Sequence, residues 1–217
     1  MGRAKYSDNK RREMLLMFID TARSIIDKEG IDQVTIRKIA KASGYNSATI
    51  YLYFHDLDEL LCLASLSYVE DLIREWIEEL KIPRNSVETY CYSWELYSKY
   101  AFLQPEIYNH LFFSQHSRPF VELVRYYHQL FPERLEDIGD TIEEVLLGTP
   151  HTDKERSILL PLAKDGLINE DDLLMISSLA AAYFRKLLEK KCELGDKVNT
   201  EELVQQQLKA VRFLLKA

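Results

Sequence analysis

Apolar residues recur at steps of three and four along almost the whole chain, and this spacing constrains the fold more than any other feature of the sequence. Between Asn9 and Glu29, the side chains on one helical face are Met14, Leu15, Phe18, Ile19, Ala22, Ile25 and Ile26, and the opposite face is charged. No stretch alternates with period two for long enough to indicate a strand. Seven glycines and six prolines are also few for a strand-rich chain. The sequence therefore predicts an all-α fold.

The same pattern predicts two parts. Residues 1–55 read as a compact set of three helices, and residues 56–217 as a second helical domain that opens with a long connecting helix over 56–80. Pro83 interrupts the periodicity after that helix. We expect further helices near 87–103, 105–115, 118–147, 153–164, 170–194 and 200–216.

Charge is distributed unevenly between these parts. The net charge of -7 would by itself argue against a nucleic-acid partner. Residues 1–55, however, hold ten basic and six acidic side chains, a net of +4, which leaves -11 for the rest of the chain. This asymmetry indicates a basic end that faces nucleic acid and an acidic body that faces something else.

Two short helices separated by a glycine-containing turn follow the first long helix. Thr35 can cap the first of them, Gly44 can adopt the positive φ that ends it, and Asn46 can cap the second. Ile50 and Phe54 lie four residues apart on the inward side of the second helix. This order is typical of a helix-turn-helix, whose second short helix enters the major groove of DNA.

The side chains of this segment suit DNA. The second helix carries small or polar residues that allow close approach to base edges, and two tyrosines that can donate to phosphate oxygens. The preceding helix adds hydroxyl and cationic groups for the backbone of DNA. From the residue chemistry we expect contacts from Thr35, Arg37, Lys41, Asn46, Ser47, Ala48, Thr49, Tyr51 and Tyr53. The basic N-terminal segment either reaches DNA as an arm or stays solvated as a disordered leader.

The segment TIRKIAKASGYNSATIYLYF, residues 35–54, followed by HDLDELL, closely resembles the N-terminal domain of the TetR family of bacterial transcriptional regulators. The resemblance is strong over residues 9–65; beyond them only length, helicity and helix order match. It implies that Tyr45, like Ser47, Ala48, Thr49, Tyr51 and Tyr53, contacts DNA. It also implies that a ligand in the body changes the tilt of the helix over 56–80. The chain departs from the family at Ser47 and Leu57, where lysines are frequent.

Aromatic side chains are concentrated in residues 90–131, which hold 13 of the 24 in the chain. Rings that carry hydroxyl groups or an imidazole favour a pocket for a small apolar or aromatic molecule. The alternative is that these rings form an ordinary core, and that the body binds a protein partner. The predicted ligand-binding residues are Tyr90, Trp94, Tyr97, Phe112, Phe113, His116, Tyr126 and Tyr127.

The last two predicted helices are apolar around much of their circumference. A homodimer joined through them would present two recognition helices about 34–36 Å apart to a palindromic DNA operator. The alternative is that they cover the core of their own chain. The predicted dimerisation residues are Leu179, Tyr183, Leu187, Val204, Leu208, Val211 and Leu215.

Other classes of function find little support. Cys62, Cys91 and Cys192 lack the paired spacing of disulfide or zinc-binding cysteines. The five histidines form no metal-ligand motif, and the only candidate ligands for a metal site are His110 and His116 together with Glu106. We therefore expect no metal site and no cofactor. No catalytic constellation, signal peptide or membrane-spanning stretch is visible.

Together these features predict a cytoplasmic, homodimeric, sequence-specific transcriptional regulator rather than an enzyme. The favoured form is a repressor that a small apolar or aromatic ligand releases from double-stranded DNA. The alternative is a helical DNA-bound protein whose body binds a protein partner.

Overall fold

The computed structural model describes residues 2–113, 129, 131–132 and 154–216. Every regular element within these residues is helical, which confirms the predicted all-α fold. The helix expected over 118–147 lies outside the described residues. No helix in the described part has the length and apolar composition needed to cross a membrane. The chain divides into two compact units, Met1–Tyr68 with Glu106–Leu135, and Val69–Pro105 with Glu136–Ala217.

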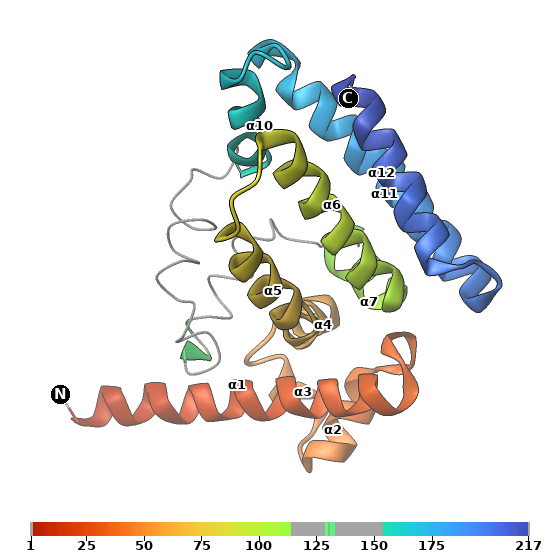
Figure 1. Ribbon diagram of the computed structural model, residues 1–217. Helices are drawn as coiled ribbons and strands as arrows, with labels where there is room; N and C mark the ends of the chain where they lie inside the picture. Colours follow the sequence, from red (N-terminus) through yellow and green to blue (C-terminus); the bar gives the residue numbers. More distant parts are fainter. Residues whose placement is uncertain (1, 114–128, 130, 133–153, 217) are drawn as a thin grey trace. The chain divides into compact units, whose positions relative to one another are not determined.

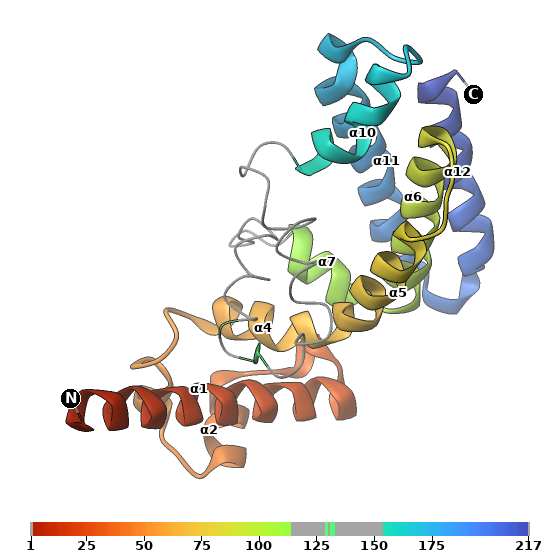
Figure 2. The ribbon, with the colours of Figure 1, turned by 60° about the vertical axis from the view of Figure 1, so that its left-hand side comes forward.

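The first unit is built around the long helix α1 (Gly2–Glu29), which packs against α2 (Ile36–Ser43) and α4 (Leu57–Ser65) (Figures 1 and 2). A 3-10 turn (Ile31–Gln33) and the short helix α3 (Ser47–Ile50) complete the N-terminal part, and α7 (Pro105–Phe113) belongs to the same unit from Glu106 onward. The core includes Phe18, Ile19, Ala22, Ile39, Ile50 and Leu60, each at most 2% exposed. The helix faces that the apolar periodicity predicts to be buried are therefore buried in this unit.

The long connecting helix predicted over 56–80 is divided in the structure. The helix α4 ends at Ser65, a 3-10 turn spans Leu66–Val69, and α5 (Glu70–Leu80) follows. The Ser67 hydroxyl donates to the Ala64 carbonyl (2.9 Å), a local hydrogen bond that competes with the helical ladder. Leu66 and Val69 are both 1% exposed. The hydrogen bond and the buried packing of this turn therefore interrupt the helix, although the apolar periodicity of the sequence continues through it.

The second unit is a helical bundle centred on α6 (Ser86–Leu103). This helix packs along α12 (Thr200–Leu215) and also contacts α5, α10 (Lys154–Lys164) and α11 (Leu173–Leu194) (Figure 1). Two 3-10 turns, Glu170–Asp172 and Gly195–Lys197, flank α11. A capping box begins α6, since Asn85 Oδ1 accepts from Glu88 N (2.9 Å) and Glu88 Oε2 accepts from Asn85 N (3.2 Å). The bundle gives the aromatic residues of α6 a fixed framework.

Candidate functional site

The helix-turn-helix predicted from the sequence is present, with its caps in place. The Thr35 hydroxyl accepts from Lys38 N (3.2 Å) at the start of α2, and Asn46 Oδ1 accepts from Thr49 N (2.8 Å) at the start of α3. Between them Gly44 has φ 75°, the left-handed conformation that glycine adopts without strain. Tyr45 N donates to the Ala40 carbonyl (3.0 Å) and so closes the turn. These short-range bonds set the direction in which α3 leaves α2.

Phe18 on α1 packs against the aromatic side chains of this segment. Its side chain is fully buried, and its ring lies 5.7 Å from that of Tyr45, 5.8 Å from that of Tyr53 and 6.3 Å from that of Phe54. The three contacted rings flank α3 on both sides in sequence. The pairs with Tyr45 and Phe54 are edge-to-face and the pair with Tyr53 is tilted, and ring pairs of these kinds favour particular relative orientations. Phe18 therefore fixes α3 against α1, a role that periodicity alone did not assign to it.

All ten residues predicted to contact DNA keep accessible surface. Tyr51 is 55% exposed and Tyr45 is 43% exposed. Thr35, Arg37, Lys41, Asn46 and Ala48 are exposed as well, and Ser47, Thr49 and Tyr53 are half-buried. They come from one continuous stretch, Thr35 to Tyr53, which contains α2 and α3, while Ile50 and Phe54 are buried in the core as predicted. The DNA atoms that each of them contacts stay a prediction.

Two further interactions define what this surface can offer. The Thr49 hydroxyl donates to Asn46 Oδ1 (3.0 Å), so that its oxygen keeps lone pairs that can accept from a base amino group. The Arg11 guanidinium lies 5.7 Å from the centroid of the Tyr53 ring. Arg11 belongs to α1, which begins at Gly2 rather than near Asn9. The N-terminal segment is thus helical, and it brings one cation beside the predicted DNA contacts.

Part of the predicted ligand-binding set comes together in the second unit. Trp94 lies 5.9 Å from Tyr97 and 5.8 Å from Phe184 between ring centroids, and Tyr90 lies 6.5 Å from Trp94. Trp94 and Tyr97 are half-buried, whereas Tyr90 is buried. Phe184 on α11 is 1% exposed, and it is not among the residues predicted to bind a ligand. We call these four residues the aromatic cluster.

Two other predicted ligand-binding residues belong to the first unit. Phe112 and Phe113 are half-buried on α7 of the first unit, and Phe112 contacts the ring of Tyr108 at 6.0 Å. His116, Tyr126 and Tyr127 lie outside the described residues. Spacing along the sequence could not find Phe184, because α11 meets α6 only through the tertiary fold.

Polar aromatic contacts join α5 to α6 in the same unit. Trp76 Nε1 donates to Ser93 Oγ (3.0 Å), and the Tyr100 hydroxyl donates to Glu75 Oε2 (2.7 Å). Burial, followed by the hydrogen bond and negative charge of Glu75, raises the pKa of Tyr100 to about 12. The phenol therefore stays a hydrogen-bond donor at neutral pH and holds the two helices together.

The residues predicted to form the dimer interface divide into two groups. Leu187, Val204, Leu208, Val211 and Leu215 are at most 5% exposed within the single chain. Four of them lie on α12, which packs along α6, and Leu187 lies on α11, so within a single chain these five side chains are already buried in its own core. Leu179 is 50% exposed and Tyr183 is half-buried.

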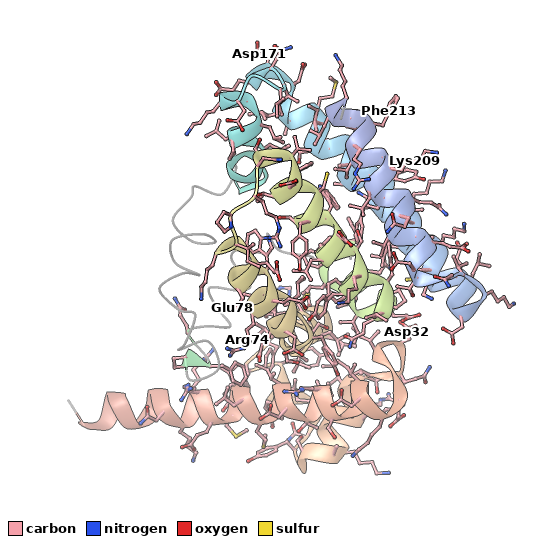
Figure 3. The ribbon with its side chains drawn as sticks, viewed as in Figure 1. Asp32, Arg74, Glu78, Asp171, Lys209 and Phe213 are labelled. Atoms are coloured by element: carbon pink, nitrogen blue, oxygen red, sulfur yellow. The ribbon has the colours of Figure 1, made fainter. Side chains whose placement is uncertain are left out.

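Other apolar side chains are exposed on the same hairpin. They are Leu174 (75%) and Met175 (57%) on α11 and Phe213 (81%) on α12, which projects from the helix surface in Figure 3. We refer to these three residues and Leu179 together as the exposed apolar face, a name for the large apolar side chains that are at least half exposed on this hairpin.

Comparisons with known proteins agree with the helix-turn-helix. Residues 18–62 match the family model for bacterial regulatory proteins of the tetR family. This range holds the buried Phe18, α2, α3 and most of α4. No curated protein matches the chain.

Three similar solved structures extend the likeness to the whole fold. RolR in complex with resorcinol has a TM-score of 0.61 at 16% identity, covering 96% of this chain and 94% of that one. FadR of Thermus thermophilus, a TetR-family repressor in complex with lauroyl-CoA, has a TM-score of 0.60 at 18% identity, covering 93% of each chain. FadR of Bacillus subtilis with stearoyl-CoA has a TM-score of 0.54 at 18% identity, covering 92% and 97%. The chain therefore carries the N-terminal domain of tetR-family bacterial regulatory proteins at residues 18–62, and over most of its length it shares the fold of these three solved structures.

Proposed function

We propose that this regulator is a repressor that binds a palindromic operator as a homodimer and leaves it when a small apolar or aromatic effector binds the body. The observation that carries the proposal is the accessible, capped segment from Thr35 to Tyr53, which packs on the buried ring of Phe18. Only this end of the chain has a net positive charge, because residues 1–55 carry a net +4 and the rest -11.

The α3 segment suits insertion into the major groove. Ala48 is small and exposed, so that it allows the helix to approach base edges closely. Thr49 supplies an acceptor next to it. Tyr51, with more than half its surface exposed, extends beyond these residues and can donate to a phosphate. Arg37 and Lys41 on α2 add the charge that phosphate binding requires.

Substitutions that leave the fold intact test these assignments. We expect Tyr51→Phe, which removes only a hydroxyl, to weaken binding to all DNA sequences by roughly two- to tenfold, the value of one hydrogen bond. We expect Thr49→Ala to change sequence preference, with Thr49→Ser as the control that keeps the hydroxyl. Fluorescence anisotropy with operator and unrelated duplexes measures both. Unchanged affinity and preference in both variants would rule out α3 as the recognition helix.

The aromatic cluster supports an effector that is apolar or aromatic. Trp94 and Tyr97 keep accessible ring surface beside the buried Phe184, so an apolar molecule could stack there without unfolding the core. RolR was solved with resorcinol, which is aromatic, and the two FadR proteins were solved with acyl-CoA molecules, whose acyl chains are apolar.

Tryptophan fluorescence can detect such binding, since Trp76 and Trp94 are the only tryptophans in the chain. In a Trp76→Phe variant, Trp94 alone reports, and we expect its emission to change on titration with resorcinol or lauroyl-CoA. The active compound should also release operator DNA. A compound that changes emission equally in a Tyr97→Leu variant would place its site away from the cluster. Tight operator binding with no response to apolar or aromatic compounds would favour the protein-partner alternative.

A further inference from the structure

Three metal-binding residue types meet in the first unit, in an arrangement that sequence spacing did not reveal. Asp58 and Cys62 lie one turn apart on α4, and His110 comes from α7. One ligand atom from each lies within 4.8 Å of the other two. His110 Nε2 and Asp58 Oδ1 are 3.1 Å apart. The spacing of the three cysteines in the sequence does not indicate such a cluster.

Burial and bonding set this cluster apart from an ordinary ion pair. Cys62 is 1% exposed, and the side chains of Asp58 and His110 are 17% and 20% exposed. His110 Nε2 is buried, and despite its closeness to Asp58 it makes no hydrogen bond of acceptable geometry with the described residues. A buried ring nitrogen without a hydrogen bond is costly, unless a further group binds it.

The geometry is compatible with a tetrahedral cation. With zinc–nitrogen and zinc–oxygen bonds of about 2.0–2.2 Å, two ligand atoms of a zinc tetrahedron are separated by roughly 3.3 Å. The 3.1 Å between His110 Nε2 and Asp58 Oδ1 is close to that separation. The remaining ligand distances need only a small movement of side chains, because all lie within 4.8 Å.

The donor set selects the kind of metal. Thiolate and imidazole ligands favour zinc and similar transition ions over magnesium or calcium, which prefer oxygen. The same three residue types also build nucleophilic triads, but a thiol on a residue 1% exposed cannot reach a substrate. We propose that Asp58, Cys62 and His110 bind Zn²⁺, with a fourth position left for water.

Such a site would have a regulatory consequence, and this step rests on the proposed function. The helix α4 begins at Leu57, directly after the segment predicted to contact DNA, and α7 comes from a distant part of the sequence. A cation bound to both helices fixes one against the other. If operator DNA changes the affinity of the protein for Zn²⁺ by some factor, then Zn²⁺ changes the affinity for the operator by that same factor.

Cobalt substitution tests metal binding in the full-length protein without DNA, so that failure of the site and failure of the DNA-binding proposal are distinguishable. We expect Co²⁺ to produce a thiolate charge-transfer band in the near ultraviolet and tetrahedral bands in the visible, and Zn²⁺ to displace both. The bands should persist in Cys91→Ser and Cys192→Ser, and disappear in Cys62→Ser. Absence of a thiolate band in the wild type, or its persistence in Cys62→Ser, would overturn the proposal.

A second ligand provides a test that does not depend on the buried cysteine. His110→Gln should raise the apparent Kd for Zn²⁺, measured by competition with a chromophoric chelator, by about tenfold or more. His55→Gln is the matched control, because the His55 side chain is 84% exposed and bonded to Asp56 Oδ2 (2.9 Å). Circular dichroism establishes that each variant is folded. Equal Kd values for folded His110→Gln and the wild type would exclude His110 as a ligand.

Discussion

At the scale of single residues, polar contacts on otherwise apolar helices have consequences that depend on pH. Tyr100 on α6 donates to Glu75 on α5, and burial together with this carboxylate raises the pKa of the phenol to about 12 from its ordinary value of 10. The pKa values of Tyr92 and Tyr68 are also raised, in both cases mainly by burial. The folded chain therefore favours neutral phenols more strongly than the unfolded chain does.

We predict that this preference stabilises the protein below pH 10 and is lost as pH rises towards 12. Between these values the unfolded chain releases the Tyr100 proton while the folded chain retains it, so the free energy of unfolding falls as pH rises. Urea unfolding at pH 9, 10 and 11 should show a shallower fall for Tyr100→Phe than for the wild type. Equal slopes for the two proteins would show that Tyr100 does not contribute.

Residue roles could be predicted where they depend on close neighbours in sequence. The caps Thr35 and Asn46 and the positive φ of Gly44 follow from local backbone geometry, and all three are confirmed. The support from Phe18 and the meeting of Cys62 with His110 depend on helices that pack from distant parts of the chain. No spacing rule contains that information.

At the scale of elements, the junction between α11 and α12 is closed by a buried lysine. Lys191 is 6% exposed, and its ammonium group donates to the carbonyl oxygens of Gly195 (3.1 Å) and Val198 (2.9 Å). These bonds occupy carbonyls just beyond the C-terminus of α11, where a cation also interacts favourably with the helix dipole. The turn between α11 and α12 is thereby fixed.

We predict that Lys191→Met destabilises the protein by about 1–3 kcal/mol, because it leaves buried carbonyl groups without their donor. Lys190→Met is the matched control, since Lys190 is exposed on the same turn, and it should change stability by no more than about 0.5 kcal/mol. Urea unfolding followed by circular dichroism measures both. Similar values for the two variants would mean that the buried bonds contribute nothing.

Element boundaries were predictable where a cap or glycine marks them, and less so where packing decides. Periodicity continues through 56–80, yet Leu66–Val69 forms a 3-10 turn whose Ser67 and buried neighbours depend on tertiary contacts. The seam of α12 was also ambiguous. An apolar stripe indicates that a helix packs against another apolar surface, but it does not indicate whether α6 of the same chain or a second chain provides that surface.

At the scale of the whole molecule, the exposed apolar face is where we propose that two chains meet. Leu174, Met175 and Leu179 on α11 and Phe213 on α12 are each at least half exposed, an unusual concentration for one hairpin of a monomer. The buried residues of the same helices hold the hairpin against α6. A rigid hairpin of this kind suits a two-fold interface between four helices.

We predict that Leu179→Glu converts a dimer into a monomer, since the interface would have to bury an unpaired carboxylate. Leu103→Glu is the control, because Leu103 is 61% exposed at the end of α6 and outside this face. Sedimentation equilibrium gives the mass of each variant. A wild type that is monomeric at micromolar concentration, or a Leu179→Glu variant that stays dimeric, would contradict the proposed interface.

The central claim is that the segment from Thr35 to Tyr53 binds a specific palindromic DNA sequence, and selection from a random pool of duplexes tests it most directly. We predict enrichment of two half-sites related by two-fold symmetry, with centres about 10 base pairs or a multiple of that apart. The enriched sequence should change when the pool is selected with Thr49→Ala. A pool that shows no enriched sequence after repeated selection with the wild-type protein would contradict the account.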